Sequence, residues 1–259
     1  MMFQSIIDAH IHLDVYQDNH RKQILDELEK NHVDFLISVS KNLGSAKINQ
    51  TLAQVRNNVK VAYGFHPEQR LPMEEELDQL FQFIHKHHDE MVAIGEVGLP
   101  YYLRKDHPDL QHEAYIELLE YFIVKAKEYN KPVVLHAVYE DAPIVCSILE
   151  KHSVKQAHFH WFKGDSKTIE RMIQNGYFIS VTPDVLYEAE IQQLVQKYPL
   201  DKIMVETDGP WNFKGPFKNQ RTHPKMIHQS IKEIAHIKKE DLGSVYRKVY
   251  LNTKEFFSI

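Results

Sequence analysis

The sequence predicts the α/β class and, within it, a single (β/α)₈ (TIM) barrel. Eight short apolar, β-branched runs alternate with longer amphipathic stretches along the chain. Such alternation favours a parallel sheet, because each helix forms the crossover between two parallel strands. The length of 259 residues suits one closed barrel of this kind. No Gly/Ser-rich or Pro-rich linker interrupts the alternation, so residues 1–259 are expected to form one domain.

The strand candidates are short runs rich in Val, Ile and other apolar residues. Each is followed by a helical stretch or by a loop that leads to one. An open doubly wound sheet is the alternative arrangement, but no G-x-G-x-x-G turn follows the first run, which weakens it. In chain order, the eight predicted strands are Ser5–His12, Asp34–Ser40, Lys60–Phe65, Met91–Glu96, Pro132–His136, Gln156–His160, Tyr177–Val181 and Lys202–Glu206.

Two helical stretches carry clear local signals. Ser166 can cap a helix over Lys167–Asn175, and Gly176 can end it in the left-handed conformation. Near the end of the chain, apolar residues recur at helical spacing, which predicts a helix with one buried face. These residues are Leu242, Val245, Tyr246, Val249 and Tyr250.

Composition limits the classes of function. With 36 acidic against 31 basic residues, the formal net charge is -5, and no basic stripe predicts an extended duplex-coating surface. An enzyme that takes the end of a nucleic-acid strand is still compatible with this charge. Cys146 is the single cysteine, which suits a reducing compartment. The opening residues lack a signal-peptide pattern and no apolar run reaches membrane-spanning length, so we expect a cytoplasmic protein without membrane association.

Polar residues that can bind metal lie at the ends of five predicted strands. His10 and His12 are two apart in a strand, so they point to the same side. The carboxyl ends of the strands are the face where barrel enzymes build their active sites. Burying four imidazoles and two carboxylates there costs several kcal/mol unless they are paired or coordinated, so a metal centre is expected. The six candidate ligands are His10, His12, Glu96, His136, His160 and Asp208.

The segments around these residues resemble the TatD-type metal-dependent hydrolases. Those proteins are barrel enzymes of the amidohydrolase superfamily and are described mostly as deoxyribonucleases. The motifs occur in the family's order between residue 8 and about residue 210. They read D-A-H-I-H-L-D, G-F-H-P-E, G-E-V-G-L-P-Y-Y, P-V-V-L-H, H-W-F-K-G and E-T-D-G-P.

The resemblance implies a centre of two divalent metal ions. His10, His12 and Asp208 would hold one ion, and Glu96 would bridge to a second held by His136 and His160. The nitrogen-rich donor set fits Zn²⁺, Mn²⁺ or Fe²⁺ better than Mg²⁺, although Mg²⁺ is still compatible.

The implied activity is phosphodiester hydrolysis, as in a deoxyribonuclease, by a water that the two metals activate. Asp208 would accept the proton of that water, and Glu96 would act beside it as the second catalytic carboxylate. His66 and Tyr102 would lie on the substrate side. His158 falls outside the motifs and is expected in the core or behind the metal ligands.

Three positions depart from the family pattern and leave the substrate open. Pro100 stands where an aspartate is usual, and Val138 stands where an arginine is usual. The late R-N-E-P segment is here Arg221-Thr222-His223-Pro224. Valine lacks the fork with which arginine grips phosphate. A phosphodiesterase or nuclease acting on strand ends is therefore the first hypothesis, a small-molecule amide or ester hydrolase the second, and a non-catalytic metal or nucleotide binder the third.

Overall fold

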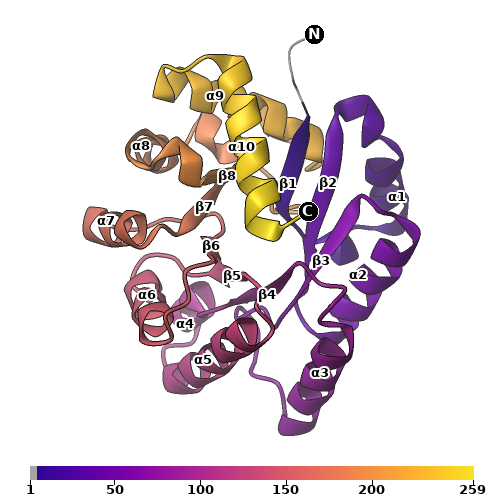
Figure 1. Cartoon of the computed structure of the whole chain (residues 1–259), viewed down its shortest axis with the longest axis vertical. Helices are drawn as coiled ribbons and strands as arrows, with labels where there is room; N and C mark the ends of the chain where they lie inside the picture. Colours follow the sequence, from indigo (N-terminus) through magenta and orange to yellow (C-terminus); the bar gives the residue numbers. More distant parts are fainter. Residues whose placement is uncertain (1–4) are drawn as a thin grey trace.

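Eight parallel strands lie side by side in sequence order in the computed structural model, which describes residues 5–259. Helices alternate with the strands and surround them (Figure 1). This arrangement confirms the predicted (β/α)₈ barrel. The strands are β1 (Ile6–Ile11), β2 (Val33–Val39), β3 (Val59–Tyr63), β4 (Ala93–Gly98), β5 (Val133–His136), β6 (Ala157–Phe159), β7 (Phe178–Val181) and β8 (Ile203–Val205).

The segment that follows β8 completes the ring against β1. The Asp208 N–H donates to the His10 carbonyl at 2.9 Å, and the His12 N–H donates to the Gly209 carbonyl at 2.8 Å. The buried Asp8 carboxylate accepts from both the backbone N–H and the hydroxyl of Thr207. Three of the candidate metal ligands, His10, His12 and Asp208, are thereby fixed by the same backbone contacts that close the barrel.

The helices form the outer layer around the strands. Within the described part of the chain, no helix combines the length and apolar character that crossing a membrane requires. The helices are α1 (Asp18–Asp26), α2 (Leu43–Val55), α3 (Glu74–His87), α4 (Tyr101–Asp106), α5 (His112–Glu128), α6 (Asp141–Lys151), α7 (Ser166–Asn175), α8 (Ala189–Lys197), α9 (Ile227–Lys238) and α10 (Leu242–Phe257).

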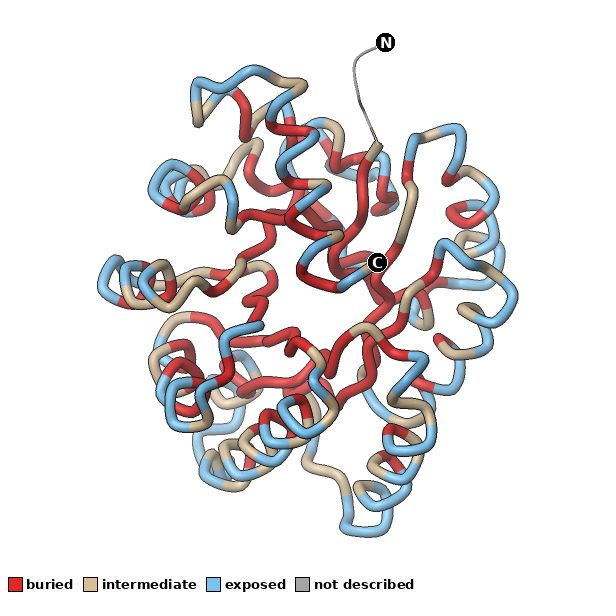
Figure 2. Tube along the Cα trace, in the orientation of Figure 1, coloured by how far each residue is buried: buried red, intermediate tan, exposed pale blue. Residues whose placement is uncertain are grey.

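Figure 2 shows buried residues along the strands and on the inward sides of the helices. The buried apolar side chains form one large cluster between helices and strands and a second cluster inside the barrel. The inner cluster contains apolar side chains from the strands, including Ile7, Ala9 and Met204. Phe256 and Phe257, at the end of α10, pack against this cluster. In Figure 1, the C-terminal end of the chain accordingly lies over the middle of the ring. The last helix therefore helps to fill the barrel interior.

The local signals were right for the last helix and partly right for α7. α10 buries Val245, Tyr246 and Val249, as the spacing predicted. Gly176 ends α7 with φ 74°, in the left-handed region. The predicted cap Ser166 was wrong, because it is the first helical residue. Asp165 is the cap, and its carboxylate accepts from the N–H groups of Lys167 and Thr168.

Candidate metal centre

The six candidate metal ligands converge at the carboxyl ends of the strands. β1 positions His10 and the adjoining His12, β4 carries Glu96, and β5 ends at His136. The other two, His160 and Asp208, lie just beyond β6 and β8. Each of the six is at most 9% exposed. Residues separated by up to about two hundred positions in the sequence thus form one buried polar cluster.

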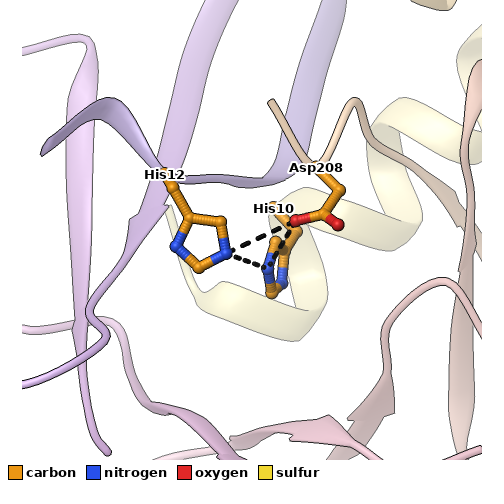
Figure 3. Close-up of side chains that lie close together, drawn as sticks. All are labelled: His10, His12 and Asp208. Carbon is orange, nitrogen blue, oxygen red and sulfur yellow. Dashed lines mark hydrogen bonds and ion pairs between the residues drawn. The ribbon is translucent and has the colours of Figure 1, made fainter. Parts of the chain in front are cut away.

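His10, His12 and Asp208 form the first group of facing ligand atoms (Figure 3). The Nε2 atoms of the two histidines lie 3.4 Å apart. Each of these nitrogens lies 3.4 Å from Oδ1 of Asp208. Both imidazole edges and one carboxylate oxygen therefore point at a common position, as the ligands of a metal ion do.

Glu96, His136 and His160 form the second group. Oε1 of Glu96 lies 3.1 Å from Nδ1 of His136 and 2.7 Å from Nε2 of His160. The other carboxylate oxygen, Oε2, lies 3.2 Å from Nε2 of both His10 and His12. Each oxygen of Glu96 thus faces a different group of ligand atoms.

The hydrogen bonding of the cluster fits a metal centre. Oε2 of Glu96 and Oδ1 of Asp208 are buried and accept no hydrogen bond of good geometry from any residue that the structure describes. A buried carboxylate oxygen without such a partner is costly, and a cation coordinated by it removes that cost. Imidazole nitrogens together with carboxylate oxygens form a donor set typical of Zn²⁺, Mn²⁺ or Fe²⁺. The residues present therefore fit divalent metal.

The histidines keep both carboxylates ionised despite their burial. Burial alone would raise the pKa of Glu96, but the surrounding imidazoles outweigh it and hold that pKa well below its usual range. The pKa of Asp208 is likewise lowered, because the contacts with His10 and His12 outweigh burial. Burial would lower the pKa of His12, yet Asp208 and Glu96 raise it to about 9. The cluster is built around two anionic carboxylates.

His66 and Tyr102, predicted on the substrate side, lie beside the cluster. Nε2 of His66 is 3.5 Å from Oε1 of Glu96, and burial lowers the pKa of His66 to about 3. His66 is therefore neutral at physiological pH, and because its Nδ1 accepts from the Glu68 N–H, its Nε2–H is the group that can donate to a substrate. With His12 and Glu96 it also forms a further group of facing ligand atoms. Tyr102, at the start of α4, is 48% exposed.

The sequence analysis missed Glu68. Its Oε1 lies 3.0 Å from Nε2 of His136, on the opposite side of the ring from Glu96. The same carboxylate accepts from the N–H groups of Tyr102 and Leu103 at the start of α4. Glu68 thus connects a candidate metal ligand to the loop on the substrate side. Its position as the last residue of the G-F-H-P-E motif could have indicated this role.

Glu206 was also missed, although it belongs to the E-T-D-G-P motif. Its Oε1 accepts from the N–H of Trp161 and lies 3.6 Å from Nδ1 of His160. Its Oε2 accepts from the hydroxyl of Ser180. Glu206 therefore supports His160 from behind and fixes the backbone that follows it.

His158 lies in the interior of the barrel, as expected. It is fully buried, its Nε2 lies 2.6 Å from the Ser180 hydroxyl oxygen, and its ring packs against Phe256 and Phe257. Burial places the pKa of His158 well below its usual range, so the ring is neutral. A neutral ring with these neighbours contributes to packing.

A cavity of about 390 Å³ opens onto the metal cluster. Three candidate ligands, His136, His160 and Asp208, belong to its wall. Side chains from the loops form the rest of the wall, namely His66, Glu68, Tyr102, Val138, Trp161, Lys163 and Trp211. The volume is sufficient for a ligand of roughly nucleotide or drug size.

Comparison with known proteins gives a consistent result. The family model described as TatD related DNase matches residues 7–258. A Haemophilus influenzae protein named as an uncharacterized metal-dependent hydrolase is 39% identical over 255 residues, covering 98% of this chain and 100% of that protein. The Homo sapiens protein named Deoxyribonuclease TATDN3 is 30% identical over 261 residues, covering 97% of this chain and 94% of that protein.

Solved structures of other proteins have the same fold as this chain. The crystal structure of YJJV, described as a TatD homolog from Escherichia coli, superposes with a TM-score of 0.89 at 24% identity and covers 98% of both chains. A hydrolase TatD family protein from Entamoeba histolytica gives a TM-score of 0.81 at 22% identity and covers 99% of both chains. At these identities, the likeness concerns the barrel itself.

Proposed function

The chain belongs to the TatD-related DNase family, and from this premise we propose that it is a metal-dependent hydrolase that cleaves phosphodiester bonds at the ends of DNA strands. The human relative named as a deoxyribonuclease supports the choice of DNA. The cytoplasmic location expected from the sequence is part of the same proposal. Activity at strand ends agrees with the net charge of -5, because end recognition does not require an extended basic surface.

The observation that carries the proposal is the position of Glu96 between two groups of ligand atoms. One of its oxygens faces His10 and His12, and the other faces His136 and His160. We infer a centre of two divalent ions, Zn²⁺, Mn²⁺ or Fe²⁺, with Glu96 shared between them. His10, His12 and Asp208 would hold the first ion, and His136 and His160 would hold the second. When bound, such ions supply Lewis-acid activation of water and neutralise charge on a phosphoryl group.

Asp208 is assigned the role of proton acceptor. It lines the cavity, and its lowered pKa keeps it ionised and able to take a proton at a carboxylate oxygen. Neutral His66 borders the same cavity and can hydrogen-bond a substrate oxygen.

We predict that Asp208→Asn lowers kcat by about 10²- to 10⁴-fold, the range for losing a positioned base. Metal-loaded wild type and variant are compared on phosphodiester, phosphomonoester, ester and amide substrates, with the metal content of both measured. Asp201→Asn is the matched control, since Asp201 is exposed and precedes β8, whereas Asp208 follows it. Wild-type turnover by a metal-replete Asp208→Asn protein would contradict the assignment.

A second candidate, hydrolysis of a small-molecule ester or amide with the same metal centre, has one specific observation in its favour. Val138 lines the cavity where the family pattern places a phosphate-binding arginine. The same substrate panel separates the two candidates. Turnover of esters or amides without cleavage of any phosphodiester would replace the nuclease proposal with this one.

A further inference from the structure

Aromatic side chains form much of the cavity wall outside the metal cluster. The chain has two tryptophans, Trp161 and Trp211, and both line this cavity together with Tyr102. Trp211 is 44% exposed and Tyr102 is 48% exposed. Large aromatic surfaces left open beside a polar catalytic centre are typical of ligand-binding sites. Val138, also in the wall, extends the apolar surface.

Trp161 is held firmly in this wall. Its backbone adopts φ 38°, a left-handed conformation that is unfavourable for a bulky residue and is retained where the surroundings enforce it. The backbone N–H donates to Glu206 at 2.8 Å, and the indole N–H donates to Asp184 at 2.6 Å. Because Asp184 uses the one polar hydrogen of the indole, the ring offers a ligand its π surface.

The charged groups around the wall restrict which ligand fits. The Glu68 carboxylate is already engaged by His136 and by two backbone N–H groups, so it is a poor partner for a cationic ligand. Among the described residues that line the cavity, Lys163 is the only lysine or arginine. Its Nζ lies over the Trp161 ring, 5.7 Å from the ring centre. The wall therefore suits a flat, uncharged ring that has an anionic group close by.

We propose that Trp161, Trp211 and Tyr102 form a stacking subsite for the nucleobase of the nucleotide whose phosphodiester bond is cleaved, with Lys163 beside its phosphate. This inference rests on the proposed nuclease function and names the part of the substrate that the cavity recognises. Stacking accepts any base, because every base has a π face. Stacking of the base supplies binding energy in place of the phosphate-binding arginine, since Val138 occupies the position where the family pattern has that arginine.

The two tryptophans provide a direct test that does not depend on catalysis. Metal-loaded protein is titrated with a short oligothymidylate that carries phosphorothioate linkages to slow hydrolysis, and with an abasic strand of the same length and linkages. Binding is followed by tryptophan fluorescence, which reports on this cavity because both tryptophans line it. We expect the strand with bases to quench the fluorescence and to bind roughly 5- to 150-fold more tightly than the abasic strand.

Variants locate the effect. Trp211→Ala should remove most of the difference between the two strands, with Trp161 remaining as the reporter, whereas Trp211→Phe should keep it because a stacking ring is retained. Tyr121→Ala is the matched control, since Tyr121 is 46% exposed but lies on α5 and contacts Phe81 and Lys125. It should bind both strands as the wild type does.

Equal affinity of the wild type for the two strands, or an unchanged difference in Trp211→Ala, would overturn the subsite. A parallel assay of DNA hydrolysis separates this failure from failure of the proposed function. Hydrolysis together with equal affinities overturns the stacking subsite alone. Base-dependent binding without cleavage of any phosphodiester overturns the nuclease activity and supports the wall as a nucleotide-binding surface.

Discussion

Single carboxylates behind the candidate metal ligands decide how those ligands are presented. Glu68 accepts a hydrogen bond from Nε2 of His136, and this leaves Nδ1, which faces Glu96, with its lone pair available for a metal ion. Burial would raise the pKa of Glu68, but the contact with His136 and the hydrogen bonds from the Tyr102 and Leu103 N–H groups together outweigh burial and lower that pKa. Glu68 is therefore an ionised acceptor that selects one tautomer of His136.

At this scale we predict that Glu68→Ala weakens binding of the second metal ion by about 10- to 100-fold, the usual effect of losing a carboxylate behind a ligating histidine. Calorimetric titration of chelator-stripped protein with Zn²⁺ or Mn²⁺ measures it, and the ion bound by His10 and His12 should be affected less. Glu75→Ala, on the exposed face of α3, is the control. Unchanged affinities at both positions would show that Glu68 does not orient His136.

At the scale of secondary structure elements, the start of α7 shows how one residue fixes a boundary. Asp165 accepts from the N–H groups of Lys167 and Thr168 and from the Thr168 hydroxyl. We predict that Asp165→Ala lowers the free energy of unfolding by about 1 kcal/mol, the typical value of an N-cap. Ser166→Ala should change it by less than about 0.5 kcal/mol, because the exposed Ser166 hydroxyl bonds only the flexible Lys197 side chain.

Urea unfolding of both variants checks this prediction. The opposite ranking, with Ser166→Ala the more destabilising, would restore the cap that the sequence suggested. Since α7 follows the loop that carries Trp161 and Lys163, the boundary also bears on the cavity wall. Loss of the cap should alter the conformation of the loop that carries Trp161 and Lys163 more than that of the neighbouring strands.

At the scale of the whole molecule, the metal centre ties together strands from both ends of the chain. Its candidate ligands come from β1, β4, β5 and the segments after β6 and β8. Ions that bind only the folded protein stabilise it by mass action, by about 2.7 kcal/mol at a free concentration of one hundred times Kd. For a chain of this size we therefore predict that chelation lowers Tm by roughly 5–10 °C.

Thermal unfolding with and without chelator measures this shift, together with elemental analysis of the protein before chelation. His12→Asn should reduce the shift, whereas His85→Asn, an exposed histidine on α3, should preserve it. If added Zn²⁺, Mn²⁺ and Fe²⁺ all leave the Tm of the chelated wild type unchanged, the six residues do not form a metal centre.

The sequence by itself determined the barrel, because the alternation of apolar strands and amphipathic helices is a local property. It also placed His10, His12 and Glu96 at one edge, since parallel strands bring their carboxyl ends together. Strand limits agreed to within about two residues. The expected cap at Ser166 failed, because neighbouring Asp165 and Ser166 offer alternative caps and only the backbone conformation selects between them.

Only the tertiary structure decided what surrounds those ligands. Glu68 meets His136 across 68 positions, and Glu206 meets Trp161 across 45, distances in sequence that no local pattern encodes. The packing of Phe256 into the barrel and the gathering of both tryptophans around the cavity have the same origin. The periodicity of apolar residues and the sequence motifs specify which residues share a face of a strand or helix. Contacts between side chains from different loops depend on how the closed barrel aligns those loops.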